Sequence, residues 1–169
     1  MRRLFFALWP PRETAAALHR WATEAQGASG GRVTRVGTIH LTLAFLGDTG
    51  EGVLPLLKAL KVKGEKHLLP IDQARYWKQS NIVWVGPEET PIQLKVLAEN
   101  LQAVLKENAF AFDKRPFAAH ATLIRNARAP ERLPPLPRTR WPVEECVLVE
   151  SVPAGKGRDY TVLARYALT

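Results

Sequence analysis

The sequence predicts an α+β fold built on antiparallel sheets, and three observations support this prediction. Segments with strand-like patterns alternate with segments of helical spacing along the 169 residues. Several neighbouring strand-like segments are joined by connections too short to hold a crossover helix, so we expect them to pair antiparallel. The tetrapeptides His40-Leu41-Thr42-Leu43 and His120-Ala121-Thr122-Leu123 lie 80 residues apart. This spacing indicates a single domain, residues 1–169, made of two similar lobes.

The first half of the chain contains two predicted strands and two predicted helices. In order, we expect a strand over 3–9, a helix over 13–25, a strand over 38–46 and a short amphipathic helix over 53–63. The first helix places Leu18, Trp21 and Ala22 on one side. Each segment is followed by residues that end regular structure: Pro10-Pro11, the cluster Gly27–Gly31, Gly47-Asp48 and Gly64.

The second half holds the clearest helix and most of the strands. We predict strands over 68–77 and 81–85 around a hairpin turn at 78–80, a helix over 91–108, and strands over 116–125, 143–152 and 160–168. The helix is clear because five apolar residues recur at 3.6-residue spacing: Leu94, Leu97, Leu101, Val104 and Leu105. Arginines interleave with prolines over 125–140, which predicts an extended loop. Gly155-Lys156-Gly157-Arg158 lacks the spacing of a phosphate-binding loop and is predicted to be a hairpin turn.

The composition excludes several classes of protein. Hydrophobic residues at 46% and charged residues at 24% are typical of a globular domain. The single cysteine excludes a disulfide framework, and its apolar surroundings indicate that Cys146 belongs to the core. The start of the chain imitates a signal peptide, but its apolar run is short and has no cleavage site, so we expect a cytoplasmic protein with no membrane segment. The net charge of +8 favours a polyanionic partner.

The repeated motif predicts acid–base chemistry on a phosphate. Residues i and i+2 of a strand point to the same face, so His40 projects with Thr42, and His120 with Thr122. One imidazole can accept a proton while the other donates one, and threonine hydroxyls can hydrogen-bond anionic oxygens. Two acid–base groups on opposite sides of a site suit in-line displacement at phosphorus.

Other histidines and other chemistries are disfavoured. His19 and His67 lack the following threonine and are expected to be ordinary surface residues. Neither motif histidine has an Asp or Glu at the spacing of a metal ligand, so we expect no metal and no cofactor. The five tryptophans are scattered, and most are expected in the core or at the rim of the site.

The paired His-x-Thr-aliphatic motifs resemble the signature of the 2H phosphoesterase superfamily. The finer similarity is to the bacterial and archaeal RNA 2′,3′-cyclic phosphodiesterases, formerly called 2′-5′ RNA ligases. It extends over residues 3–7, 40–47, 115–117 and 165–169, and over Arg125, five residues after the second histidine. One departure is Ala118-Ala119, where that family often has a proline directly before the histidine.

The resemblance implies a fold and an activity. The fold has two antiparallel sheets flanking a central groove, with helices outside, and the protein is a metal-independent monomer. The implied substrates are RNA with 2′,3′-cyclic phosphate ends, or 2′,3′-cyclic nucleotides, which are hydrolysed to 2′-phosphates. Weak 2′-5′ ligase activity accompanies hydrolysis in the family. The resemblance assigns His40 as the acid and His120 as the base, an order that the symmetry of the motifs leaves open.

Two further residues are candidates for binding the nucleobase. Phe45 and Arg125 each lie five residues after a motif histidine, and a ring and a guanidinium can both stack on a base. Strict strand alternation would turn them away from the histidines, so this role requires a bulge or the end of the strand. Core packing is the alternative for Phe45, and phosphate binding the alternative for Arg125.

Two other functions remain open on the sequence alone. The chain could be a catalytically silent module that binds RNA ends through the same basic groove. It could also be an enzyme whose substrate is a small cyclic nucleotide or a 2′-5′ oligonucleotide.

Overall fold

The computed structural model describes all 169 residues and has an α+β fold of three α-helices and ten strands. The helices are α1 (Arg12–Ser29), α2 (Leu54–Lys58) and α3 (Ile92–Glu107). The strands are β1 (Arg2–Leu8), β2 (Arg32–Val33), β3 (Leu41–Thr49), β4 (His67–Ile71), β5 (Gln73–Trp77), β6 (Ile82–Gly86), β7 (Ala121–Arg125), β8 (Thr139–Val143), β9 (Glu145–Ala154) and β10 (Gly157–Ala167). Short 3₁₀ turns occupy Val36–Thr38 and Glu51–Val53.

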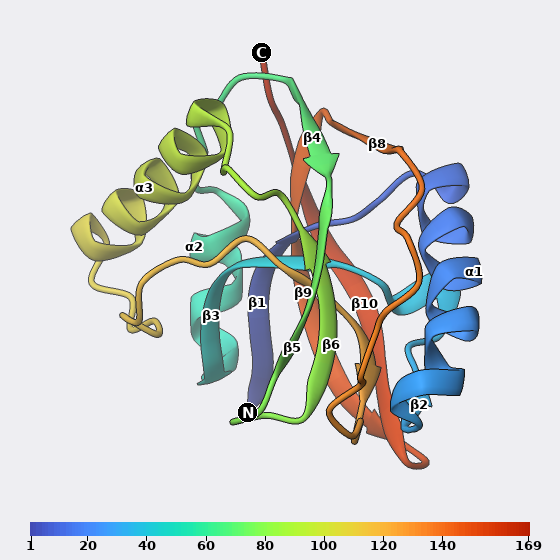
Figure 1. Ribbon diagram of the computed structural model, residues 1–169. Helices are drawn as coiled ribbons and strands as arrows, with labels where there is room; N and C mark the ends of the chain where they lie inside the picture. The colour runs from blue at the N-terminus through green and yellow to red at the C-terminus, as the bar shows by residue number, and fades with distance from the viewer.

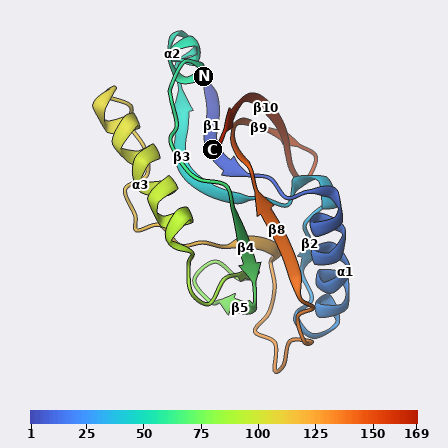
Figure 2. The same cartoon turned by 90° about the horizontal axis from the view of Figure 1, so that it is seen from above.

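Eight strands form one antiparallel sheet whose two halves barely touch. The order is β10-β9-β1-β3-β7-β6-β5, with β2 paired to the other end of β7. The central strands β3 and β7 share one residue pair, Leu41 with Ala121, whereas β1 and β3 pair along seven. Helices α1 and α3 flank the strands on opposite sides (Figures 1 and 2). The α+β class with antiparallel pairing is therefore confirmed, and each half carries one His-x-Thr motif.

The main core lies between the sheet and the helices. It contains 31 buried residues, among them Leu18 and Trp21 of α1 and four leucines of α3: Leu94, Leu97, Leu101 and Leu105. The helical spacing predicted these residues. Leu41 and Leu43 of β3, with Ala121 and Leu123 of β7, fill the same core. The residues between them in sequence therefore face away from it.

The two motif histidines precede their strands, contrary to the predicted strands over 38–46 and 116–125. Strand β3 begins at Leu41 and β7 at Ala121. The preceding backbone is a 3₁₀ turn in one case and carries no ladder bonds in the other. In both cases a carbonyl two residues before the histidine accepts a bond from the imidazole.

Other predicted boundaries were also wrong. The expected strand over 68–77 is two strands, because Asp72 leaves the ladder and its carboxylate accepts a hydrogen bond from the Glu88 amide. Strand β4 then pairs with β8 in a separate two-stranded sheet, which also takes Val143 from the predicted strand over 143–152. The helix expected over 53–63 ends at Lys58, and α1 continues through Gly27 to Ser29.

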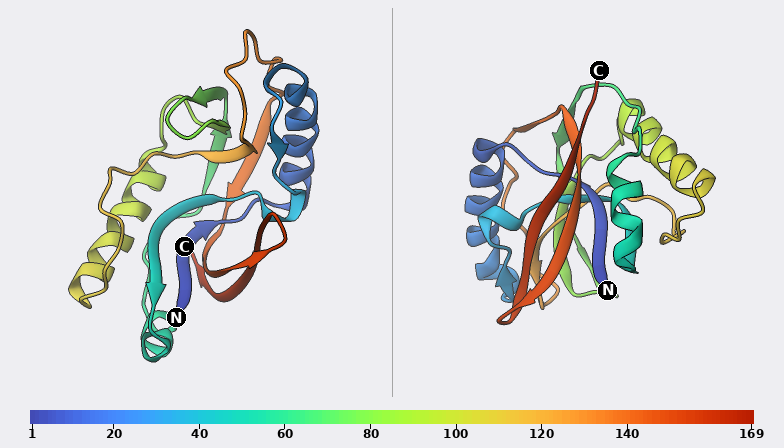
Figure 3. Two further views of the ribbon diagram at one scale, coloured as in Figure 1. Left: turned by 90° about the horizontal axis from the view of Figure 1, so that it is seen from below. Right: turned by 180° about the vertical axis from the view of Figure 1, so that it is seen from behind.

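The β9–β10 hairpin brings the end of the chain back to its beginning. Strand β9 pairs with β1, and β10 covers the outer edge of β9. The hairpin runs along the molecule, and its turn lies near β2 (Figure 3). The turn occupies Gly155 and Lys156, as predicted.

Candidate active site

Two histidines and two threonines meet on one face of the sheet, at the junction of its two halves. Leu41 and Ala121 are directly opposite each other and both point into the core. Continuing this antiparallel register places His40 across from Thr122, and His120 across from Thr42. All four side chains then project to the opposite face, away from the core. The two motifs form one site with approximate two-fold symmetry.

Both imidazoles are held in the same tautomer. His40 Nδ1 lies 2.7 Å from the carbonyl oxygen of Thr38, and His120 Nδ1 lies 2.8 Å from that of Ala118. A carbonyl can only accept, so each Nδ1 carries the hydrogen and donates it. Each Nε2 therefore remains free to accept a proton, or to donate one once the ring is protonated.

A glycine allows the backbone before His120 to take this position. A Cβ on Gly86 of β6 would overlap the carbonyl oxygen of Ala119. Because Gly86 has no side chain, the segment that holds His120 can pack against β6. The departure from the family pattern at Ala118-Ala119 thus leaves the anchoring carbonyl of Ala118 in place.

The surroundings favour neutral imidazoles in the free protein. Burial lowers the pKa of His40 to about 4, with smaller lowering contributions from the charges of Arg125 and His120, while the Thr38 carbonyl acts in the opposite direction. The pKa of His120 is also lowered, again mainly by burial and further by Arg125. The guanidinium of Arg125 is therefore close enough to act on both rings.

Aromatic side chains surround His40. The indole of Trp9 stacks on the imidazole with ring centroids 4.9 Å apart and planes 11° apart. Phe5 lies at 5.1 Å, and Tyr160 of β10 meets the ring edge-on at 5.0 Å. These contacts fix the ring orientation and account for its burial. The sequence offered a signal for two of them, because Phe5 and Trp9 share one face of the first predicted strand.

His120 has a similar but more open aromatic environment. Trp77 lies 4.6 Å from its ring and Trp84 lies 6.0 Å from it. Trp84 is in register with Thr122, which brings it to the site. The expectation that most tryptophans are core or rim residues is met, because Trp21, Trp84 and Trp141 are buried, but it did not include the direct contacts with the histidines.

A bulge in each central strand turns Phe45 and Arg125 toward the histidine face. In β3, Leu43 is the extra residue between the Ala44 and Thr42 pairs with β1. In β7, Leu123 is the extra residue between the Ile124 and Thr122 pairs with β6. Each bulge comes three residues after a motif histidine and reverses the alternation beyond it. The bulge that Phe45 and Arg125 need in order to face the histidines is therefore present in both strands.

Phe45 and Arg125 differ in their own contacts. Phe45 is paired with Phe5 across β1 and β3, packs beside the Phe5 cluster, and carries the guanidinium of Arg3 4.8 Å above its ring. Arg125 is exposed at the end of β7, and none of its side-chain donors bonds within the protein. The hydroxyls of Thr42 and Thr122 are likewise without partners in the protein and are not sealed from solvent. Arg125 and the two threonine hydroxyls are therefore available to a ligand, whereas the Phe45 ring is already in contact with Arg3 and the Phe5 cluster.

Comparison with known proteins identifies the family. Residues 8–84 match the family model described as LigT-like phosphoesterase. The chain is 35% identical to the RNA 2′,3′-cyclic phosphodiesterase of Escherichia coli K12 over 173 residues, covering 99% of this chain and 97% of that one. This chain belongs to the LigT-like phosphoesterase family. A protein of the same name from Thermus thermophilus is 36% identical over 181 residues, with 98% and 90% of the two chains covered.

Solved structures of LigT-like phosphoesterases have the same fold. The crystal structure of E. coli LigT complexed with 3′-AMP superposes with a TM-score of 0.86 at 33% identity, covering 99% of this chain and 98% of that one. A crystal structure of a Thermus thermophilus protein gives a TM-score of 0.82 at 32% identity, with 98% and 97% covered. These structures confirm the α+β fold with antiparallel sheets that the sequence predicted.

Outside the histidine pair, this LigT-like chain offers little other chemistry. Cys146 is buried, and burial raises the pKa of its thiol to about 12. No group of three or more His, Cys, Asp or Glu side chains is arranged to hold a metal ion. No helix has the length and apolar character needed to span a bilayer. His19 is half-buried, and His67 is not a plain surface residue, because its Nε2 is buried without a partner.

Proposed function

We propose that this chain hydrolyses 2′,3′-cyclic phosphate at RNA ends to a 2′-phosphate, with His40 and His120 as its acid–base pair. Membership of the LigT-like family and near full-length similarity to two relatives named RNA 2′,3′-cyclic phosphodiesterase make it a cyclic phosphodiesterase. The observation that carries the catalytic proposal is the pair of free Nε2 atoms on one face, each fixed by an identical Nδ1 bond.

The reaction needs one proton removed and one proton supplied. Nε2 of neutral His120 takes a proton from water as the water oxygen bonds to phosphorus. The bond between phosphorus and the 3′ oxygen breaks, and Nε2–H of protonated His40 donates its proton to that oxygen. The 2′ oxygen keeps the phosphate. The two histidines come from opposite halves of the sheet, which suits attacking and leaving oxygens in line on opposite sides of phosphorus.

The remaining groups act on the charge of the phosphate. Thr42 and Thr122 donate hydrogen bonds to the two nonbridging oxygens, each hydroxyl lying across the sheet from the opposite histidine. The anionic phosphodiester favours the protonated form of a nearby imidazole, so binding raises the pKa of His40 from its low value in the free protein. The substrate therefore helps to create the acid that its own cleavage needs.

All of these groups come from one chain, which supports a monomeric enzyme. The net charge of +8 supports a polyanionic partner such as RNA. We place this enzyme in the cytoplasm, where its single buried thiol needs no oxidising environment.

The decisive experiment measures turnover of 2′,3′-cyclic AMP and of a short RNA with a 2′,3′-cyclic phosphate end, both in EDTA, with product identification by chromatography. We expect the 2′-phosphate, loss of turnover in His40→Ala and His120→Ala, and full turnover in the control His19→Ala. Binding of RNA ends without turnover would favour the silent module instead. A 3′-phosphate product would reverse the proposed roles of the two ribose oxygens.

A further inference from the structure

Two arginines lie directly opposite each other beside the histidine pair. Arg32 of β2 is in register with Arg125 of β7, and Val33 with Ile124. Ile124 is in the core and Val33 packs against it, so the two arginines project to the other face, with the histidines. Both guanidiniums are exposed.

This arginine pair has no acidic partner. The ion pairs of the molecule use Arg2, Arg35, Arg115 and Arg165, and none involves Arg32 or Arg125. Like charges directly opposite on two strands destabilise a sheet. The fold nevertheless enforces the pair, because Gly31, at φ +84°, lets β2 approach so closely that a Cβ there would overlap the Arg125 carbonyl oxygen. A bound anion would relieve this repulsion.

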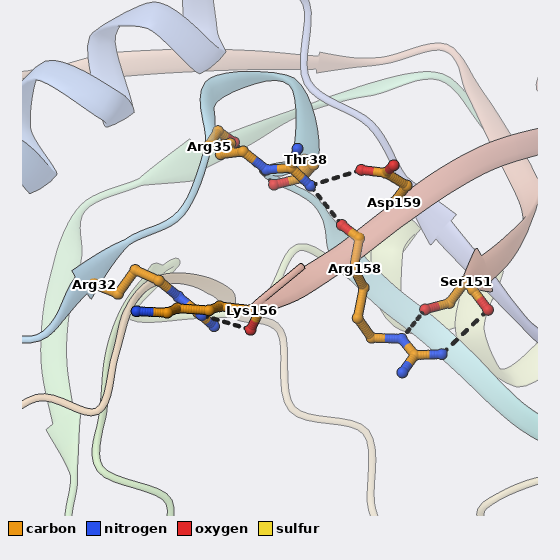
Figure 4. Close-up of polar contacts among 7 residues, drawn as sticks. All are labelled: Arg32, Arg35, Thr38, Ser151, Lys156, Arg158 and Asp159. Carbon is orange, nitrogen blue, oxygen red and sulfur yellow. Dashed lines mark hydrogen bonds and ion pairs between the residues drawn. The ribbon is translucent and has the colours of Figure 1, made fainter. Parts of the chain in front are cut away.

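A third cation stands beside the pair at the tip of the β9–β10 hairpin. Arg32 Nη1 donates to the main-chain carbonyl oxygen of Lys156 at 2.6 Å, so this residue of the hairpin tip is held against the Arg32 guanidinium through its backbone (Figure 4). The tip is fixed by a second arginine, since Arg35 Nη2 donates to the Arg158 carbonyl at 2.6 Å and to Asp159 Oδ1 at 2.9 Å. Asp159 neutralises Arg35, whereas Lys156 has no acidic partner.

Arg125 and Arg32 form a row of positive charges that begins beside the catalytic histidines. Arg125 is close enough to the imidazoles for its charge to act on both, and Arg32 is its cross-strand neighbour. A cyclic mononucleotide has one phosphate, and under the proposed function the histidines and threonines bind it. The terminal nucleotide of an RNA carries a second phosphate on its 5′ oxygen. Guanidiniums bind phosphate oxygens with paired, charge-assisted hydrogen bonds.

We propose that Arg32, together with Lys156, is a second phosphate subsite that lies next to Arg125 and binds the phosphodiester on the 5′ side of the terminal nucleotide. This inference rests on the proposed function and adds a substrate preference to it. The subsite makes the enzyme selective for RNA ends over free 2′,3′-cyclic nucleotides. The subsite recognises the charge and position of a phosphate, not the identity of a base.

The test compares two substrates that differ by one linkage: 2′,3′-cyclic AMP and the adenylyl dinucleotide ending in the same cyclic phosphate. Arg32→Gln should keep kcat/KM for the mononucleotide and lose about tenfold for the dinucleotide, the scale of one charge-assisted bond. Lys156→Gln should show a smaller loss of the same kind, since its main-chain bond to Arg32 is retained. The matched control is Arg20→Gln, which removes an exposed charge from α1 and should change neither value.

A second dinucleotide with an uncharged methylphosphonate linkage separates charge recognition from a structural effect. Wild type and Arg32→Gln should hydrolyse this substrate equally. Equal losses on all three substrates would overturn the subsite and show that Arg32 acts by holding the hairpin. Equal wild-type values for mononucleotide and charged dinucleotide would also overturn it.

Equilibrium binding distinguishes failure of the subsite from failure of the proposed function. Fluorescence anisotropy with a labelled dinucleotide bearing a 3′-phosphate needs no turnover. We expect Arg32→Gln to weaken binding and to reduce the slope of log K against log salt by about one. If wild type turns over neither substrate but this binding result holds, the subsite stands and the enzymatic function falls. Unchanged binding and slope would remove Arg32 from nucleic-acid recognition.

Discussion

At the scale of single residues, the anchoring of an imidazole is distinct from its use. His67 donates its Nδ1 hydrogen to the carbonyl two residues before it at 2.9 Å, as His40 and His120 do. Its Nε2, however, is buried without a partner, and the residue two positions later is Leu69. The threonine at that position separates the site histidines from the others. The sequence could therefore identify the pair, although the shared Nδ1 bond became visible only in three dimensions.

The two threonine hydroxyls provide a residue-scale prediction. Thr42→Val and Thr122→Val keep the side-chain shape and remove a donor that has no other partner in the protein. A hydrogen bond to a charged oxygen contributes about 1.5–3 kcal/mol, so kcat/KM for 2′,3′-cyclic AMP should fall roughly tenfold to a hundredfold at each site. The control Thr23→Val lies on α1, outside the site. Full activity in both site variants would exclude the hydroxyls from the mechanism.

The lowered pKa values of the histidines predict the pH dependence. The parameter kcat/KM reports the free enzyme, in which His40 has a pKa of about 4 and the pKa of His120 is lowered too. Its active form needs His40 protonated and His120 neutral, so the bell-shaped profile of kcat/KM should be centred below pH 6.5. The bound phosphate raises both pKa values, which moves the kcat profile to higher pH. The pH profiles of kcat and kcat/KM can be measured by stopped flow. Two profiles that coincide, or a kcat/KM that rises from about pH 6 to 8, would contradict this prediction.

At the scale of elements, the strand bulges decide which residues reach the site. Leu43 and Leu123 are ordinary aliphatic residues in strands, and no sequence pattern distinguishes a bulged leucine from a regular one. If the side chains of these strands alternated regularly, Phe45 and Arg125 would point away from the histidines. The strand break at Asp72 was similarly hidden, because its carboxylate pairs with a backbone amide 16 residues away. Local patterns predicted the elements and the core, whereas these features depend on pairing between distant segments.

The bulges predict a role in nucleotide binding for the residues that they redirect. Phe45→Ala and Arg125→Ala should each raise KM for cyclic nucleotides by about five- to a hundredfold, the scale of ~1–3 kcal/mol per stacked base. Steady-state kinetics and thermal melts measure KM and Tm on the same samples. Phe110, half-buried against the main core, provides the control, because Phe110→Ala should lower Tm and leave KM unchanged. A Phe45→Ala variant that mainly loses Tm would assign that ring to the core.

At the scale of the whole molecule, the site exists because two half-sheets meet at a single residue pair. The pair Leu41–Ala121 brings the two motifs together, and the core behind it holds both strands in place. The same sheet adds β2 beside β7 and the β9–β10 hairpin beside β1, so the cations of one flank and the aromatic residues of the other converge on the histidines. The repeat in the sequence predicted this convergence, but its near-symmetry left the acid and the base undistinguished.

Breaking that symmetry requires a substrate whose two sides differ chemically. A nitrophenyl phosphodiester has a leaving group stable enough to depart without a proton, so the acid becomes unnecessary. His40→Ala should lose roughly a hundredfold to ten-thousandfold on a cyclic nucleotide and recover much of that loss on the nitrophenyl ester. His120→Ala should stay slow on both, because water still has to be deprotonated. Recovery of His120→Ala would exchange the two roles. If neither variant recovers, both imidazoles chiefly stabilise the charge of the phosphate. The rate of each variant should then depend on the leaving group as strongly as the wild-type rate does.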